Sequence, residues 1–552
     1  MKPLDWWVLI GSVTAIVGYG LWRARQSSTT HQYLLAGKTM PWYAMALSIM
    51  ATQASAITFI STTGQAYVDG MRFVQFYFGL PLAMILISAF VVPAFHRSGV
   101  YTAYEYLEQR FDAKTRTLVA ILFLIQRGLA AGVALYAPAV VLTVILGWPD
   151  QYTSMMMGVV VVLYTTLGGI KAVTWTDFQQ MLVMFAGLLV ALGMAIWLLP
   201  TDVGFTGALR VAGAAGRLNA VVTSFDLNDR YNLWSGLFGG MFLALAYFGC
   251  DQSQVQRYLT GSSIAQSRLS LLFNAAAKIP MQFSILLIGA IVFVFYTFEK
   301  PPIIFHPQEL KRIESSAQFG ELSRRFDLAY ETRRDTARRF LQGAAEPGEF
   351  RASQAGLDAV RRDASRLVER ESGAPFNDTN YIFLTFVTRY LPAGVVGLIM
   401  AAIFAAAMST ISAEINSLAT VSVIDIYKRH WIRGASDKHY LNASRAATVF
   451  WGGYAVATAS YGRSLGSLIE AVNMLGSLFY GGLLGVFALA FFFPRVQGTA
   501  AFIGVLAGEA AIFGAHWFTN ISFLWYNVLG AVVVVVTAVG LSQFRRTGQT
   551  SP

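Results

Sequence analysis

The segment from Ala401 to Arg429 carries polar side chains inside a stretch that is apolar and long enough to cross a bilayer. An unpartnered polar side chain is costly in hydrocarbon, so these groups should face protein, water or a ligand. Hydroxyl oxygens, together with backbone carbonyls freed by a broken helix, can hold a hard monovalent cation. The alternative is that small and hydroxyl residues only join helices to one another. The polar positions are Ser409, Thr410, Ser412, Glu414, Asn416, Ser417 and Thr420.

Two further apolar segments contain polar groups at positions where a membrane helix could break. "SIMATQASAITFISTTGQ" (48–65) holds Gln53, Ser55 and Thr58, and "LALAYFGCDQSQVQRYL" (243–259) holds Asp251 and Gln252. A helix broken at the middle of a membrane exposes carbonyls and helix ends to ligands. These two segments are therefore our candidates for discontinuous helices.

Composition indicates a polytopic membrane protein. The chain has 552 residues, of which 55% are hydrophobic and only 13% are charged. A single cysteine excludes an internal disulfide framework, and the six histidines form no HExxH or other paired motif, so we expect no enzyme. The pI near 9.6 is explained by lysine and arginine in cytoplasmic loops, so no nucleic-acid partner is expected.

Apolar runs of a length that crosses about 30 Å of hydrocarbon predict thirteen transmembrane helices in an all-α protein. Asp5 and two tryptophans replace the basic start of a signal peptide, so we expect the first helix to be retained. The predicted spans are 5–22, 40–66, 74–95, 117–146, 152–170, 174–199, 233–256, 270–297, 383–427, 444–462, 466–493, 498–518 and 522–543.

Basic loops follow alternate spans, which predicts an outside N-terminus and a cytoplasmic C-terminus in the cell membrane, as in a bacterial inner membrane. Residues 298–376 are dense in charge and lie outside by this parity. Their mixed-sign pattern predicts a solvated insertion of two or three helices.

Ten helices remain when the first and the last two are set aside. Two blocks of five, each with an odd number of crossings, must be inserted upside down relative to one another, as in inverted-repeat secondary transporters. The expected division is 1–39 (extra helix and link), 40–199 (first repeat), 200–232 (extracytoplasmic loop), 233–493 (second repeat, with the insertion 298–376) and 494–552 (two helices and a tail).

Three phrases resemble the solute:sodium symporter family: "TLGGIKAVTWTDFQQ" (166–180), "CDQSQVQRYL" (250–259) and "LPAGVVGLIMAAIFAAAMSTISAEINSLATVSVIDIYKR" (391–429). The likeness in order and spacing covers roughly residues 1–545. It implies a five-plus-five inverted-repeat core with discontinuous first and sixth core helices, and sodium-coupled import of a small polar or anionic organic solute by alternating access. The sequence is more similar to the iodide, multivitamin, monocarboxylate and sialic-acid branches than to the sugar branch. A proton-coupled carrier of this fold and a sugar symporter are the alternatives.

Carried over from the family, the primary sodium site implies the carbonyls of Ala51, Ala54 and Ala406 with the hydroxyls of Ser409 and Thr410. The resemblance also implies a possible second sodium at Asp177, Ser409 and Ser412. This chain departs from the family pattern at Ala413, where a serine often stands. The alternative for Asp177 is an ordinary interfacial residue at a helix start.

Substrate-cavity positions implied by the resemblance are Gln53, Thr58, Gln75, Tyr77, Asp251, Gln252, Lys278 and Asn473. Sugar transporters of the family place a glutamate at Tyr77 and a glutamine at Asn473, so a hexose is disfavoured. Lys278 could balance an organic anion, or it could be a snorkelling lysine near a cytoplasmic helix start.

Arg127 and Glu414 lie about 15 and about 20 Å from the cytoplasmic ends of their predicted helices. Lone charges at that depth are expensive, so we expect the two to form an ion pair in the scaffold, with coupling or gating as the alternative.

Overall fold

The computed structural model describes residues 1–24, 29–148, 150–459, 465 and 467–547. Apart from one isolated β-bridge between Met40 and Gly261, the regular structure of these residues is entirely helical. The α-helices are α1 Pro3–Ala24, α2 Thr30–Leu35, α3 Trp42–Gln53, α4 Ala56–Asp69, α5 Leu80–Leu86, α6 Val92–Ser98, α7 Ala103–Arg110, α8 Ala113–Leu146, α9 Asp150–Trp197, α10 Gly204–Ala214, α11 Gly240–Gly249, α12 Gln252–Leu259, α13 Ile264–Phe298, α14 Pro307–Glu314, α15 Phe319–Leu341, α16 Pro347–Ser372, α17 Ile382–Tyr390, α18 Val395–Val421, α19 Asp437–Ala459, α20 Leu468–Phe492, α21 Gly498–Phe518 and α22 Leu524–Thr547. Shorter helical turns are η1 Ala36–Lys38, η2 Met71–Tyr77, η3 Ile87–Val91, η4 Ser235–Gly239, η5 Thr379–Tyr381 and η6 Ser422–Trp431.

Within the described residues, nine helices are long and apolar enough to cross a membrane, or ten if α3 and α4 form one bent span. The chain is thus an all-helical multi-pass protein. The sequence predicts thirteen spans, and the difference arises at three places. Helix α9 contains two predicted spans, and its backbone leaves helical geometry at Gly169 (φ 57°, ψ −161°), near the end of the first. The predicted span 233–256 is interrupted at Cys250 and Asp251, so α11 and α12 are each too short to count as a span. Helix α19 is not among the nine, and the end of its predicted span, 444–462, lies outside the described residues.

Two helices break where the sequence places polar groups. Helices α3 and α4 meet at a bend of 55° around Ala54 and Ser55. Helices α11 and α12 meet at Cys250 and Asp251, where the Asp251 carboxylate accepts a hydrogen bond of 2.9 Å from the Ser253 amide. Serine and aspartate favour the non-helical backbone that precedes a new helix, which explains why the chain breaks at these residues.

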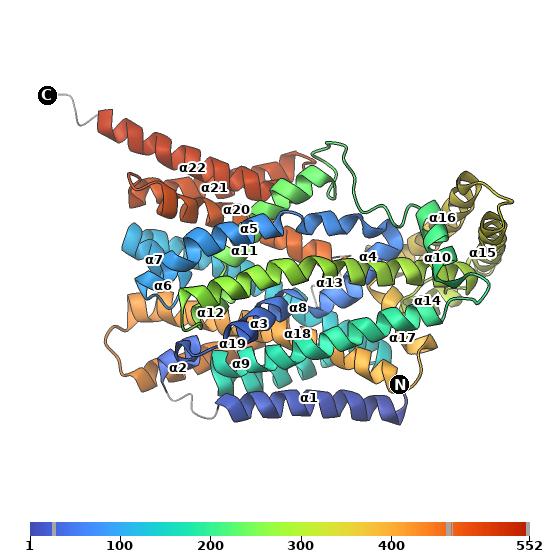
Figure 1. Ribbon diagram of the computed structural model, residues 1–552, viewed down its shortest axis with the longest axis horizontal. Coiled ribbons are helices and arrows are strands. Elements are labelled where there is room, and N and C mark those ends of the chain that lie inside the picture. The colour runs from blue at the N-terminus through green and yellow to red at the C-terminus, as the bar shows by residue number, and fades with distance from the viewer. Residues whose placement is uncertain (25–28, 149, 460–464, 466, 548–552) are drawn as a thin grey trace.

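Helix α18 lies inside the bundle, packed against α9, α1 and α8 (Figure 1). Every residue from Ile399 to Val421 on it is buried. The hydroxyl, amide and carboxyl groups of this helix therefore face other protein segments and not lipid.

The charged insertion is packed more tightly than the sequence predicts. Helices α14 to α16 extend from one end of the molecule (Figure 1), and α15 and α16 share an apolar cluster that includes Phe326 and Leu357. The fully buried Arg333 donates to the carbonyl of Tyr296 on α13, and the Tyr330 hydroxyl donates to the Phe298 carbonyl at 2.7 Å. The insertion is therefore solvated only on the side that faces away from α13, because the side that faces α13 is hydrogen-bonded to it.

Candidate functional site

The break between α3 and α4 lies directly against α18. The Thr410 hydroxyl donates a hydrogen bond of 3.0 Å to the Thr52 carbonyl in the last turn of α3. Carbonyls of a last helical turn have no partner within the helix, so they are available to other donors or to a cation. Ala51, Ala54 and Ala406 are fully buried. The structure therefore brings the open carbonyl end of α3 together with a hydroxyl of α18.

Asp177 on α9 contacts both α3 and α18 next to this break. Its Oδ1 accepts from the Ser409 hydroxyl at 2.7 Å, and its Oδ2 accepts from the Ser48 hydroxyl at 2.6 Å. Asp177 is fully buried on α9 and follows the kink at Gly169, so its place near the start of the second half of that helix is kept, and its role in binding sodium stays a prediction. Ser412 donates to the Ser409 carbonyl at 3.0 Å and not to Asp177.

Arg257 is a site residue that the sequence reasoning missed. Its Nη2 lies 3.5 Å from Asp177 Oδ2, and its Nε donates to the Thr52 hydroxyl at 3.3 Å. Arg257 directly follows the predicted span 233–256, and in the structure every residue of its helix, α12, is buried. The available signal was its place within the family phrase "CDQSQVQRYL".

A buried charge cluster joins four elements next to this region. Arg127 on α8 donates to Glu414 Oε1 on α18 at 2.9 Å and to the Tyr480 hydroxyl on α20 at 2.6 Å. It also donates to Asp251 Oδ2 at the break of α11 and α12, where the Tyr480 hydroxyl donates at 2.9 Å. The two predicted pair members meet, but Asp251, which we had assigned to the substrate cavity, is a second carboxylate partner of Arg127.

A cavity of about 80 Å³ lies between the broken helices and the charge cluster. Gln53, Tyr77 and Asn473 line it, together with Arg127 and Glu414. Thr58 lies on the first turn of α4 and is not part of this lining.

Two glutamines predicted for the cavity are held elsewhere. Gln75 Nε2 donates to the Tyr231 carbonyl at 2.8 Å, and its Oε1 accepts from the Val222 amide at 2.8 Å. Gln252 Nε2 donates to the Tyr101 carbonyl at 3.0 Å, and its Oε1 accepts from the Ala103 amide at 2.9 Å. Because each amide is already used to fix a loop or a helix start, we assign neither residue to the cavity.

Lys278 lies fully buried in the middle of the 35-residue helix α13, so the snorkelling interpretation is wrong. Its Nζ lies 5.7 Å from the centroid of the Tyr77 ring, which lines the cavity. Among the described residues it has no hydrogen-bond or carboxylate partner. Asn274 and Gln282, one turn away on either side, are also fully buried, and no described residue bonds their side-chain amides. The spacing of four in "NAAAKIPMQ" was the signal for this polar face.

A sequence profile described as "Sodium:solute symporter family" matches residues 33–317 and 364–508. The chain belongs to this family. The symporter is 29% identical to the sodium-coupled monocarboxylate transporter 1 of Xenopus laevis over 501 residues, which covers 90% of this chain and 69% of that protein. It is 28% identical to the sodium-dependent multivitamin transporter of Oryctolagus cuniculus (90% of this chain, 66% of that protein) and 27% identical to the human sodium/iodide cotransporter (92% and 68%).

The symporter also shares its fold with a Na⁺-coupled sialic acid symporter solved in a substrate-bound, outward-open state. The TM-score is 0.78 at 22% identity, and the match covers 98% of each chain. The protein is therefore a sodium-coupled solute symporter and not an enzyme, and sodium is its transported ion. The profile leaves out residues 318–363, which form most of α15 and α16.

Proposed function

We propose that this symporter imports a small organic carboxylate together with sodium across the cell membrane. The repeats would be residues 40–199 and 233–493, and the breaks at Ala54 and Cys250 would be the discontinuous points of the first and sixth core helices. On the orientation given by the basic loops, the N-terminus lies outside and the C-terminus lies in the cytoplasm.

Sodium in the primary site would be held by the carbonyls of Ala51, Ala54 and Ala406 and by the hydroxyls of Ser409 and Thr410. The hydrogen bond between Thr410 and the Thr52 carbonyl supports this assignment, because it fixes a hydroxyl of α18 against the open end of α3. Oxygen ligands without a full negative charge suit a monovalent ion that must later be released.

A second sodium would lie beside Asp177, with Ser409 and Ser412 as further ligands. The Ser409 hydroxyl that donates to Asp177 belongs to both sets, so the two ions would share one ligand residue. Arg257 at 3.5 Å from Asp177 would be repelled by an ion there, so binding of the second sodium would separate this pair.

Charge balance is the observation that carries the carboxylate assignment. Arg127 already has two carboxylate partners, Asp251 and Glu414, so it has no positive charge to offer a solute. Lys278 has none among the described residues, and an isolated buried ammonium is expensive. A solute carboxylate entering beside Tyr77 would compensate that charge, with Gln53 and Asn473 as further polar groups of the cavity lining. The monocarboxylate, multivitamin and iodide transporters among its relatives agree with an anionic solute.

The size of the cavity sets the class of carboxylate. At about 80 Å³ the cavity has room for several non-hydrogen atoms, since about 10–15 Å³ of such volume holds one water molecule. Tyr77 and Asn473 replace the residues expected for a hexose site. We therefore favour a short monocarboxylate over a sugar.

Uptake into proteoliposomes tests the proposal. A short monocarboxylate should enter in sodium and not in potassium, and the neutral amide of the same acid and a hexose should not enter. Lys278→Met should abolish carboxylate uptake, whereas Lys300→Met, at a half-exposed lysine paired with Asp327 in the insertion, should leave it unchanged. Sodium-driven hexose uptake that survives Lys278→Met would overturn the carboxylate assignment, and uptake driven by a pH gradient without sodium would overturn the proposed sodium coupling.

A further inference from the structure

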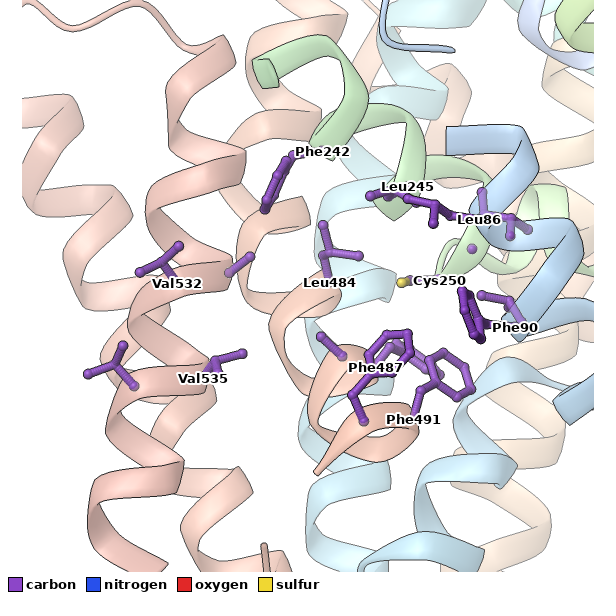
Figure 2. Close-up of a pocket in the computed structure, with 17 residues that line it drawn as sticks. Leu86, Phe90, Phe242, Leu245, Cys250, Leu484, Phe487, Phe491, Val532 and Val535 are labelled. Atoms are coloured by element: carbon purple, nitrogen blue, oxygen red, sulfur yellow. The ribbon is translucent and has the colours of Figure 1, made fainter. Parts of the chain in front are cut away.

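A second cavity lies outside the transport site, on the side of the bundle where α20 and α22 pack. It has a volume of about 360 Å³ and is bounded by α5, η3, α11, α20 and α22. Figure 2 shows the side chains of Leu245, Leu484 and Phe90 around the sulfur of Cys250. Every lining residue is an aliphatic or aromatic residue, a glycine or this cysteine. Such a wall offers nothing to a solvated ion or to a polar solute.

The exposed residues of the cavity lining lie on helices long and apolar enough to cross a membrane. Phe90, Phe492 and Val532 are 48%, 53% and 49% exposed, and each lies on a helix of membrane-spanning length. Cys250, at the inner end, is only 2% exposed. The cavity therefore runs from the lipid-facing surface to the break between α11 and α12.

We propose that an acyl chain of a bilayer phospholipid occupies this cavity. Hydrocarbon surrounds the mouth at every moment, and an empty apolar cavity forfeits the dispersion contacts of its lining. Its volume is in the range of about 300–1,000 Å³ that bound small molecules fill. The wall accepts methylene groups and excludes water, so hydrocarbon is the occupant that the surroundings supply.

A cation follows the end of α20, the helix that contributes Phe492 to the cavity. Phe492 is the last residue of α20, and the exposed Arg495 follows three residues later. A lipid whose chain enters past Phe492 would bring its phosphate toward this guanidinium. Charge complementarity therefore favours a phospholipid over a neutral hydrocarbon.

The inner end of the cavity connects the lipid to the transport core. Cys250 precedes Asp251, which holds Arg127 and Tyr480 in the charge cluster. An acyl chain between α11 and α20 would pack against the break of α11 and α12 at Cys250. Binding of the lipid should therefore raise the thermal stability of the protein, independently of the solute that is transported.

The first experiment fills the cavity by mutation. Ala488→Phe places a ring in the cavity, and Ala510→Phe makes the same change at an exposed position of α21 outside it. Both variants and the wild type are purified in mild detergent, and the phospholipid that stays bound is measured by mass spectrometry. We expect about tenfold weaker phospholipid retention in Ala488→Phe, equivalent to about 1.4 kcal/mol, and wild-type retention in Ala510→Phe. Equal retention in all three proteins would overturn the proposal.

The second experiment uses the wild-type protein without a cavity-filling substitution. Cys250 is the single cysteine of the chain, so a thiol reagent reports on the cavity alone. The wild type is stripped of lipid and treated with a membrane-permeant maleimide, with and without added phosphatidylglycerol vesicles. Phospholipid should slow the labelling of Cys250 and raise the Tm, and Cys250→Ala should show no labelling. Labelling that phospholipid does not slow, or equally rapid labelling by a charged, water-soluble maleimide, would show that the cavity is not lipid-filled.

Discussion

Removing single charges from the Arg127 cluster should destabilise the protein by unequal amounts. The cluster has one guanidinium and two carboxylates, all almost fully buried. Glu414→Gln keeps the side-chain shape and leaves Arg127 paired with Asp251, so we expect the loss of about 1.5–3 kcal/mol that one charge-assisted hydrogen bond contributes. Arg127→Met leaves two carboxylates without a cation, and breaking a buried pair in this way costs about 3–5 kcal/mol.

The double variant distinguishes a simple pair from the cluster. If Arg127 and Glu414 formed an isolated pair, neutralising both would recover most of the loss. Because Asp251 stays charged and keeps hydrogen bonds from Tyr480 and Ser253 but no cation among the described residues, Arg127→Met with Glu414→Gln should recover only a part. Adding Asp251→Asn should then restore more stability. Coupling energies of about 0.5–3 kcal/mol are typical of residues in contact, so the differences are measurable.

Thermal unfolding in detergent, followed for the single, double and triple variants, is the appropriate assay. Sodium-dependent uptake measured on the same proteins separates stability from transport. If Arg127→Met costs no more than Glu414→Gln, or if Asp251→Asn brings no recovery in the double variant, Arg127 does not balance both carboxylates.

Three further results are expected. Ser409→Ala with Thr410→Ala removes two oxygens from the primary sodium site, so the apparent sodium affinity in a thermal-shift titration should fall at least about tenfold, or about 1.4 kcal/mol; unchanged affinity would contradict the site. Arg333→Met should lower the Tm while sodium still binds, because this guanidinium ties the insertion to α13; a Tm like that of the wild type would mean that the insertion is held without it. Partial burial alone would raise the pKa of Glu108, but hydrogen bonds from Arg429 and a second arginine hold that pKa below its usual range. The stability from this contact is therefore present above the ordinary carboxyl pKa and is lost as the pH falls through the lowered pKa of Glu108. Glu108→Gln should flatten the dependence of Tm on acidic pH. An unaltered dependence would contradict a stabilising role of this contact.

The sequence predicts local features of the site better than its long-range contacts. Polar residues within apolar runs identified the bends at Ala54 and Cys250, because a break needs capping groups that a continuous membrane helix avoids. The same reasoning identified α18, because its polar residues require buried partners. These features depend on short stretches of chain.

Positions that depend on another element could not be read from the sequence. The sequence assigned no site role to Arg257, and it left Lys278 open between balancing an organic anion and snorkelling at a cytoplasmic helix start. In the structure α12 is buried along its whole length, and Lys278 lies in the middle of α13. Gln75 and Gln252 are bonded to backbone groups of remote segments, which the sequence does not reveal. Position along a helix does not reveal which segments cover it.

The lysine on α13 provides a prediction in which stability and transport change in opposite directions. An ammonium buried without a countercharge destabilises the folded state, so a methionine of similar length should pack there with a gain in stability. Lys278→Met should therefore raise the Tm of the solute-free protein while it abolishes carboxylate uptake. Lys278→Arg keeps the charge but changes its geometry, so it should retain weak uptake and no gain in Tm. Thermal unfolding without solute, paired with uptake on the same preparations, measures both effects. A lower Tm for Lys278→Met would mean that the lysine has a structural partner in the folded protein, and that the carboxylate must find its positive charge elsewhere.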